Sequence, residues 1–236
     1  MIFAVILAGG TGSRMGISDM PKQFLELKGK PILNHTLEKF LPHPRFEKII
    51  VLSPKTWINH TKEIVRRYTG ENDRIAVIEG GDTRNETIMN AIAFIDQNYG
   101  LDDDTVIVTH DSVRPFVTRR IIEENIDAAI RDGACDTVIP ATDTIVEGDG
   151  TAITSIPDRR RMYQGQTPQS FRAKALRDTY QSLSDQEKAV LTDAAKILVI
   201  KGSKVSLVRG ETYNIKITYP YDLRIARSLL EEENDD

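Results

Sequence analysis

The sequence predicts a doubly wound α/β fold with a mostly parallel sheet. Short β-branched apolar runs alternate with longer segments whose apolar residues recur with the period of a helix, as in successive βαβ units. The first apolar run, residues 3–7, passes directly into a glycine-rich loop. A chain of 236 residues that is 40% hydrophobic and 28% charged is long enough to bury the core of such a fold.

Strands and helices alternate without interruption through the first two thirds of the chain. Buried strands are predicted over residues 3–7, 48–53, 75–78, 105–109 and 137–140. Helices are predicted over residues 57–68, 84–98 and 118–131, and from Pro31 onward. The helix after Pro31 has an apolar face made of Ile32, Leu33, Leu37, Phe40 and Leu41.

The alternation stops between Ala141 and about Tyr163, where two short strands flank a Gly-Asp-Gly turn. This pattern predicts a protruding hairpin arm. Because a two-stranded hairpin is marginally stable alone, we expect the arm to pack on a second copy of the chain in a homodimer. Beyond it we expect helices from Arg172 and over 192–199, strands near 205–208 and 214–218, a last helix over 221–230 and an acidic tail.

Composition and charge exclude several classes of protein. The chain has 31 Lys and Arg against 35 Asp and Glu, a net charge of −4, which lacks the basic excess of a general nucleic-acid binder. The single cysteine, Cys135, cannot form an internal disulfide and is expected to be a buried packing residue. The apolar start, residues 2–8, is too short for a signal peptide or a membrane span, so we expect a cytoplasmic protein.

The glycine-rich loop is the most informative segment. It reads Leu-Ala-Gly-Gly-Thr-Gly-Ser-Arg-Met-Gly over residues 7–16 and is followed by Pro21-Lys22-Gln23. Backbone N–H groups at glycines can close on a phosphate chain, and Arg14 and Lys22 add positive charge. The spacing fits neither a P-loop nor a dinucleotide fingerprint. The loop therefore predicts a triphosphate site, the alternative being a tight turn with ordinary surface charges.

Two more segments carry chemistry. Asp111 follows a predicted strand at the carboxyl end of a parallel sheet, where such sheets bind ligands, and could hold Mg²⁺ at the phosphates or pair with Arg114. The neighbouring His110 is expected to pack at the strand end. The turn Gly80-Gly-Asp-Thr-Arg84 could read the edge of a small base, although Asp82 could equally be the N-cap of the next helix.

These segments together resemble the nucleotidyltransferases that activate sugar and polyol phosphates, and among them the cytidylyltransferases that act on polyol phosphates. The resemblance runs from about residue 3 to residue 226 and implies one domain over residues 1–236, with the Rossmann-like fold of nucleotide-diphospho-sugar transferases. Besides the loop, the segments that carry it are Gly80-Gly-Asp-Thr-Arg84, His110-Asp-Ser-Val-Arg-Pro115, Gln166-Thr-Pro-Gln-Ser-Phe171, Leu191-Thr-Asp193 and Asn214-Ile-Lys-Ile-Thr218.

The resemblance also implies roles for particular residues. Arg14, Lys22 and Lys216 would act in catalysis, and Asp111 would hold Mg²⁺. Residues 209–213 depart from the family's acidic pattern, which leaves a second protein ligand for the metal open. CTP would be bound by Leu7, Ala8, Gly9, Gly10, Thr11, Gly12, Arg14, Lys22, Gly81, Asp82, Arg84, Thr87 and Ser112. The acceptor would be bound by Asp111, Arg114, Thr144, Arg159, Thr167, Thr192 and Lys216.

Two of these acceptor residues lie on the predicted arm. Thr144 matches a residue that the family lends to the active site of its neighbour, and Arg159 matches its substrate-phosphate arginine. Considered without the family, Arg159 belongs to a run of three arginines, Arg159 to Arg161, of the kind that is usually solvated.

Two branches of the family differ in their acceptor. The segments 110–116 and 163–171 look like the branch that converts CTP and D-ribitol 5-phosphate to CDP-ribitol and pyrophosphate for teichoic-acid-type polymers. The alternative is the branch that acts on 2-C-methyl-D-erythritol 4-phosphate in isoprenoid synthesis, which usually has two alanines at Ser112 and Val113. Another sugar-phosphate nucleotidyltransferase and a non-catalytic CTP sensor are the remaining alternatives.

Overall fold

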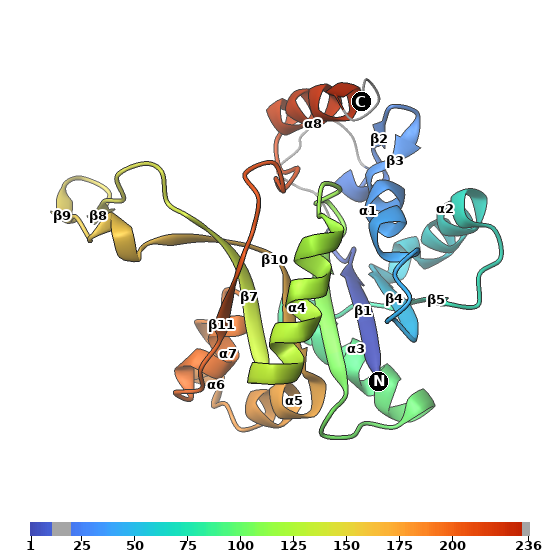
Figure 1. The fold of residues 1–236 in the computed structure, drawn as a ribbon, viewed down its shortest axis with the longest axis horizontal. Coiled ribbons are helices and arrows are strands. Elements are labelled where there is room, and N and C mark those ends of the chain that lie inside the picture. Colours follow the sequence, from blue (N-terminus) through green and yellow to red (C-terminus); the bar gives the residue numbers. More distant parts are fainter. Residues whose placement is uncertain (11–19, 233–236) are drawn as a thin grey trace.

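The structure, a computed structural model, describes residues 1–10 and 20–232. A seven-stranded sheet forms its centre, in the order β11-β7-β10-β6-β1-β4-β5, and helices cover both faces (Figure 1). Within this sheet β10 is antiparallel to its neighbours β6 and β7, and the other neighbouring strands are parallel. The predicted doubly wound, mostly parallel sheet is therefore confirmed.

The main elements follow the predicted alternation closely. The strands of the sheet are β1 (Ile2–Leu7), β4 (Lys48–Ser53), β5 (Ile75–Glu79), β6 (Val106–Asp111), β7 (Ala134–Pro140), β10 (Tyr163–Arg172) and β11 (Ser206–Arg209). The helices are α1 (Ile32–Phe40), α2 (Ile58–Thr69), α3 (Arg84–Tyr99), α4 (Arg119–Asp132), α5 (Ala173–Gln181), α6 (Asp185–Ala189), α7 (Ala195–Ile200) and α8 (Pro220–Glu232).

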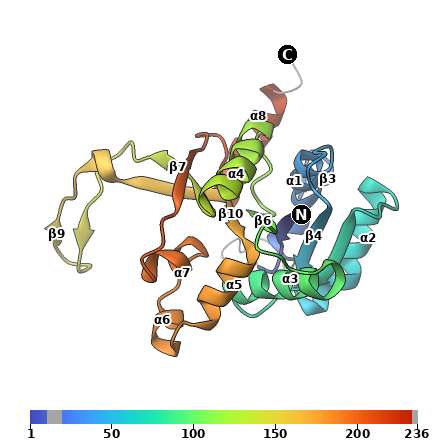
Figure 2. The ribbon, with the colours of Figure 1, turned by 60° about the horizontal axis from the view of Figure 1, so that its bottom comes forward.

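The central strand β1 is buried on both faces, which explains its uninterrupted apolar sequence. Its side chains alternate between two layers of the core. Ala4 and Ile6 pack with apolar side chains of α1, α2 and α4, whereas Phe3 and Val5 pack with those of α3, α5 and α7. Figure 2 shows α3, α5 and α7 on one side of the sheet and α4 on the other. The sheet edge at which the parallel strands end is thereby left for a site.

A third apolar cluster holds the C-terminal helix above that edge. Leu223 and Ala226 of α8 pack against Leu27, which lies in a small hairpin formed by β2 (Glu26–Leu27) and β3 (Lys30–Pro31). Val113 and Ile217 join the same cluster from the segments after β6 and before α8. No helix in the described part of the chain is long and apolar enough to cross a membrane.

Three predicted details are wrong. Residues 214–218 form no strand; this segment runs outside the sheet, and the backbone N–H of Ile217 donates to the carbonyl oxygen of Val113 at 3.0 Å. Strand β10 was not predicted, because Gly165 and Pro168 lie within it and its residues do not alternate between polar and apolar. Strand β7 begins at Ala134, three residues earlier than predicted, because the polar Asp136 lies inside it.

The arm is confirmed as a protrusion. Strands β7 and β10 run on into residues 141–162, which project far from the rest of the molecule (Figure 1). Two short strands, β8 (Glu147–Gly148) and β9 (Ile153–Ser155), pair near its tip, and both are exposed.

The single cysteine is buried, as predicted. Cys135 lies on β7 near the end that is farther from the arm, and burial raises the pKa of its thiol to about 12, as expected of a packing residue.

Candidate active site

A cavity of about 330 Å³ lies at the carboxyl ends of the parallel strands. Five segments meet there: the turn after β1, the segment with Lys22, the turn after β5, the end of β6 and the extended segment before α8. This convergence follows from the topology, because the carboxyl ends of parallel strands share one edge of the sheet. Eleven of the predicted residues line the cavity: Leu7, Gly9, Gly10, Lys22, Gly81, Asp82, Arg84, Thr87, Asp111, Ser112 and Lys216.

Part of the predicted triphosphate loop belongs to residues 11–19. Thr11, Gly12 and Arg14 lie outside the described residues. Ala8 is buried next to the cavity, and its carbonyl oxygen accepts a hydrogen bond from Gln23. The described start of the loop is thus held to the segment that carries Lys22.

Gln23 fixes this turn, a role that sequence reasoning did not assign. Its side chain is buried, and Nε2 donates to the carbonyl oxygen of Ala8 at 2.7 Å and to that of Gly10 at 3.0 Å. The short 3-10 helix η1 (Lys22–Phe24) presents Gln23 to the turn and Lys22 to the cavity. The sequence offered one sign of this role, which is that Gln23 is a polar residue directly beside Lys22, the predicted phosphate-binding lysine.

The electrostatic centre of the site is Asp111 at the end of β6. Lys216 Nζ lies 2.9 Å and Arg114 Nε 3.5 Å from its Oδ2, and Arg84 Nε lies 3.7 Å from its Oδ1. Burial alone would raise the pKa of Asp111, but these three positive charges outweigh that effect and hold the pKa far below its ordinary value. Asp111 is therefore ionised near neutral pH, and the ion pair with Arg114 that the sequence offered as an alternative is present.

Arg114 and Thr167, both predicted to bind the acceptor, are buried behind the cavity and do not line it. Arg114 Nη1 donates to the carbonyl oxygen of Asn214 at 2.7 Å, and Asn214 Nδ2 donates to that of Thr167 at 2.9 Å. Thr167 Oγ1 accepts from the backbone N–H of Asp111 at 3.2 Å. These bonds hold the segment that carries Lys216 against β6 and β10, so both residues position others.

His110 completes this buried network as a neutral side chain. Its Nε2 lies 3.0 Å from the carbonyl oxygen of Arg114, and its Nδ1 lies 3.0 Å from Thr167 Oγ1. Burial lowers the pKa of His110 to about 4, so the ring is uncharged at neutral pH. The prediction that His110 packs at the strand end is confirmed.

The turn before α3 is shaped by Gly81. A Cβ at this position would collide with Glu86, so the backbone there can fold only around a glycine. Thr83 caps α3, because its side chain accepts from the N–H of Glu86 while the Glu86 carboxylate accepts from the N–H of Thr83. The interpretation of Asp82 as the N-cap is therefore wrong, and Asp82 instead lines the cavity.

The remaining predicted acceptor residues do not line the cavity. Thr144 and Arg159 are exposed on the arm, and Arg159 Nη1 donates to the carbonyl oxygen of Thr142 at 2.8 Å. Thr192 is exposed in the segment before α7. Because the arm projects sideways from the sheet, one chain does not bring its own Thr144 and Arg159 to this cavity (Figure 1).

The described residues contain no group of three or more side chains that could hold a metal. Among the residues that line the cavity, Asp82 and Asp111 are the carboxylates. Mg²⁺ commonly takes one or two protein carboxylates and completes its shell with substrate phosphates and water. The ionised Asp111 fits such a site as a single ligand.

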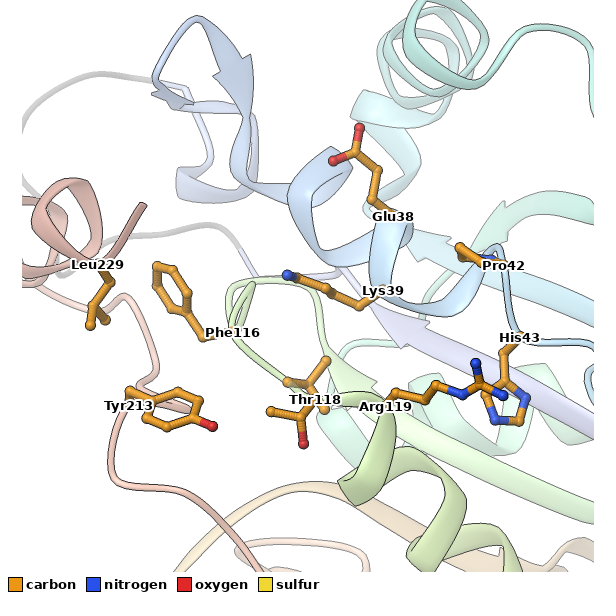
Figure 3. A pocket seen from close by; sticks show the side chains of 10 residues that line it. Glu38, Lys39, Pro42, His43, Phe116, Thr118, Arg119, Tyr213 and Leu229 are labelled. Carbon is orange, nitrogen blue, oxygen red and sulfur yellow. The ribbon is translucent and has the colours of Figure 1, made fainter. Parts of the chain in front are cut away.

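A second, larger cavity of about 560 Å³ lies between α1, the start of α4 and α8. Figure 3 shows Lys39, Phe116, Tyr213 and Leu229 around it. None of the described residues predicted for the site lines this cavity, and it receives no strand end from the sheet. The smaller cavity is therefore the candidate active site.

A glycine turn after the first strand of a doubly wound sheet, facing an ionised aspartate and two lysines, defines a nucleotidyltransferase of the Rossmann-like class. Comparison with known families then specifies the enzyme further. The sequence model of IspD, 2-C-methyl-D-erythritol 4-phosphate cytidylyltransferase, matches residues 2–232, so the chain belongs to this family of cytidylyltransferases.

Solved structures agree with this assignment. The chain is similar to 4-diphosphocytidyl-2C-methyl-D-erythritol synthase from Anaerococcus prevotii, with a TM-score of 0.80, 27% identity and coverage of 98% of this chain and 96% of that one. It is also similar to 2-C-methyl-D-erythritol 4-phosphate cytidylyltransferase from Francisella tularensis, with a TM-score of 0.79, 29% identity and coverage of 96% and 98%. The enzyme of the same name from Thermus thermophilus has a TM-score of 0.73 and 27% identity, with coverage of 98% of this chain and 100% of that one.

The comparisons bear differently on the two levels of the prediction. The family of polyol-phosphate cytidylyltransferases, and with it the use of CTP, is confirmed. The relatives are named for methylerythritol phosphate, so the comparisons favour the branch that the sequence motifs offered as the alternative over the ribitol branch.

Proposed function

We propose that this protein transfers the cytidylyl group of CTP to the phosphate of 2-C-methyl-D-erythritol 4-phosphate and releases pyrophosphate. The observation that carries the proposal is the cavity in which the glycine turn, Lys22, Lys216 and the ionised Asp111 face one another. The family match and the names of the similar structures support this acceptor.

The chemistry needs alignment and positive charge more than it needs a base. An oxygen of the acceptor phosphate attacks the α-phosphorus of CTP in line, and the bond from that phosphorus to the pyrophosphate oxygen breaks. A phosphate monoester has a second pKa of about 6, so the attacking group is already largely ionised at neutral pH. This agrees with the neutral, fully engaged His110, which is not available as a base.

Each charged side chain of the cavity has a part in this reaction. Lys22, together with the glycine turn and Arg14, would hold the triphosphate and stabilise the charge that develops on pyrophosphate. Lys216 would leave its ion pair with Asp111 and contact the α-phosphoryl group. Asp111 would hold Mg²⁺, which when bound neutralises phosphate charge.

The exposed arm suggests that the active site is completed by a second copy of the chain. We propose a homodimer in which Thr144 and Arg159 of one copy reach the cavity of the other, where Arg159 binds the acceptor phosphate. The exposure of both residues and their distance from the cavity of their own chain support this arrangement.

One observation favours D-ribitol 5-phosphate as a second candidate acceptor. Ser112 and Val113 line the cavity at positions where the methylerythritol branch usually has two alanines. Ser112 could hydrogen-bond an additional acceptor hydroxyl, and Val113 narrows the space near it. This candidate differs from the first in the acceptor alone and keeps the same reaction.

Pyrophosphate release by the purified protein tests both candidates. The assay contains Mg²⁺, CTP and either acceptor at equal, subsaturating concentration, with UTP, GTP and ATP in separate arms. Faster release with methylerythritol phosphate would support the first candidate, and faster release with ribitol phosphate the second. Release with neither acceptor, in a protein that still binds CTP, would refute the proposed reaction and favour a CTP sensor.

A further inference from the structure

Several polar side chains beside the candidate active site, Arg114 and Asn214 among them, have a buried atom without a hydrogen-bond partner among the described residues. Three of these side chains lie toward the β7 side of the site. Arg84 Nη1, Asp136 Oδ1 and Gln169 Oε1 each lack a hydrogen-bond partner within the described part of the chain. Gln169 is only 2% exposed. Because buried polar groups in proteins are nearly always hydrogen-bonded, three such atoms close together point to a ligand.

Strand register places Asp136 and Gln169 side by side. Asp136 on β7 lies opposite Gln169 on β10, and Gln169 lies opposite Thr109 on β6. Residues directly opposite on neighbouring strands share one face of the sheet, and two residues farther along β6 the same face carries Asp111. The pair therefore lies on the face that bears Asp111, toward the β7 side of the site.

Arg84 connects this pair to the cavity. It is the first residue of α3, the helix that covers this face of the sheet, and its Nε lies 3.7 Å from Asp111 Oδ1. Arg84 itself lines the cavity, and its positive charge acts on Asp136. Asp136 and Gln169 thus lie near Arg84, just beyond the residues that line the cavity.

The surroundings of Asp136 are unfavourable for a purely structural carboxylate. Burial raises the pKa of Asp136 to about 7, and the nearby negative charge of Asp193 adds to this effect. Its neighbours on β7 are Cys135 and Thr137, both buried. A side-chain hydrogen bond from Gln169 and the charge of Arg84 lower the pKa of Asp136, but they do not outweigh burial. Asp193 directly follows Thr192, which was predicted to bind the acceptor, so the region around Asp136 borders the predicted acceptor segment.

We propose that Asp136 and Gln169 bind hydroxyl groups of the acceptor's polyol chain and thereby help to select the acceptor. A polyol hydroxyl can donate its proton to Asp136 Oδ1 or Gln169 Oε1, and its oxygen can accept from Arg84 Nη1. A pocket built to bond hydroxyls discriminates strongly between acceptors, because an acceptor without the matching hydroxyl leaves the buried groups unpaired. This assignment rests on the proposed function, since it requires a polyol phosphate acceptor.

Steady-state kinetics of Asp136→Ala and Gln169→Leu test the assignment. With the acceptor that the unmodified protein prefers, we expect the KM for the acceptor to rise about 10–100-fold in Asp136→Ala, and about 3–10-fold in Gln169→Leu. The KM for CTP should stay within about twofold in both variants, because the CTP turns lie elsewhere. Asp104→Asn, a change of an exposed carboxylate near the other end of β6, is the matched control and should leave all constants unchanged.

The outcomes separate this assignment from the proposed function. Turnover by both variants with an unchanged KM for the acceptor would overturn the assignment alone. A fall in kcat with both KM values unchanged would show a structural role and would also overturn it; CTP binding and thermal melting report whether each variant is folded. Absence of pyrophosphate release by the unmodified protein with either polyol phosphate would overturn the proposed function and the assignment together.

Discussion

The cavity and the arm both carry residues predicted for one reaction, but they hold them in opposite ways. In the cavity, Asp111 contacts Lys216 and Arg114, and Arg114 in turn fixes the backbone of Asn214. On the arm, Arg159 is exposed, and its Nη1 donates to the carbonyl oxygen of Thr142 of the same arm. A single chain therefore assembles the part of the site that suits a nucleotide, whereas the residues proposed to bind the acceptor phosphate are exposed on the arm, as the proposed homodimer requires.

The largest expected effect lies on the cavity side of this comparison. Lys22→Ala should lower kcat about 10²–10³-fold, because a positioned charge that stabilises the leaving pyrophosphate is worth about 3–4 kcal/mol in the transition state. The measurement is pyrophosphate release at saturating substrates. Lys55→Ala, at a side chain that is 81% exposed, is the control. Near-normal turnover of Lys22→Ala would remove this lysine from the mechanism.

A smaller effect is expected on the arm. Arg159→Ala should raise the KM for the acceptor about 10–100-fold and leave that for CTP unchanged, since a hydrogen bond from a charged group contributes about 1.5–3 kcal/mol. Arg161→Ala, an exposed neighbour in the same 3-10 turn η3 (Arg159–Arg161), is the matched control. An unchanged KM in Arg159→Ala would indicate the solvated basic run that the sequence also allows.

Mixing the two variants sharpens the same comparison. If the arm serves the other copy, a mixed dimer of Lys22→Ala and Arg159→Ala has one cavity with an intact Lys22 and an intact partner arm. We expect the mixture, after subunit exchange, to be more active than the sum of its separate components. Strictly additive activity would contradict an arm that acts across the dimer.

The next largest expected effect is on the free energy of unfolding, which should depend on pH through Asp136 near the cavity but not through a carboxylate on the arm. The pKa of Asp136 is raised to about 7, mainly by burial and further by Asp193, against 3.8 in the unfolded chain. Between about pH 4 and pH 7 the folded state keeps a proton that the unfolded state releases, so this residue lowers stability as the pH rises through that window. Asp136→Asn removes this penalty.

We therefore expect Asp136→Asn to increase the free energy of unfolding by about 1–2 kcal/mol at pH 8, with the gain vanishing near pH 4. Thermal or denaturant unfolding at the two pH values measures this difference. Asp143→Asn, at an exposed position on the arm, should change stability at neither pH. A loss of stability in Asp136→Asn at pH 8 would contradict the raised pKa.

The smallest effect concerns the choice of acceptor. Ser112→Ala should shift the ratio of kcat/KM for the two acceptors toward methylerythritol phosphate by up to about tenfold, since a single hydrogen bond contributes about 1 kcal/mol. Competition between the two acceptors in one assay measures the ratio directly. A ratio that does not move would identify Ser112 as a turn residue without a ligand role.

The periodic elements were predictable because their residues face one environment each. Strand β1 is apolar at every position since both faces are covered, and α1 shows one apolar stripe since one face is buried. Pairing between distant segments was harder to predict. Strand β10 exists because polar groups find partners on neighbouring elements: Ser170 donates to Asn125, and Thr137 donates to the carbonyl oxygen of Pro168.

The opposite error occurred at residues 214–218. Ile215 and Ile217 alternate with polar residues, so the pattern predicts a half-buried strand. The segment instead buries Ile217 in the apolar cluster under α8. Hydrogen bonds from the Asn214 side chain to Gln166 and Thr167 hold it, in place of the backbone hydrogen bonds of a strand. The local periodicity predicted that Ile217 is buried, but it gave no information on whether the backbone of this segment pairs with another strand.

The candidate site was predictable to the extent that topology alone assembles it. Asp111 lies at the carboxyl end of β6, where parallel strands end together, and Lys22 and Lys216 reach the same cavity from segments outside the sheet. Gln23 and Gln169 were not assigned a role. The position of Gln23 beside Lys22 was a local signal for it, whereas Gln169 is distinguished only by a missing contact, which no local pattern encodes.

The arm is a direct continuation of two central strands and has no separate hinge domain at its base. Strand β7 leads into it and β10 leads back, and β10 then passes Thr167 and Gln169 on its way between β6 and β7. A displacement of the arm is therefore expected to shift the strand that carries these residues. In the proposed homodimer, assembly and acceptor selection would be linked through this strand. A molecule that binds the exposed arm is then expected to disturb the reaction without occupying the nucleotide cavity.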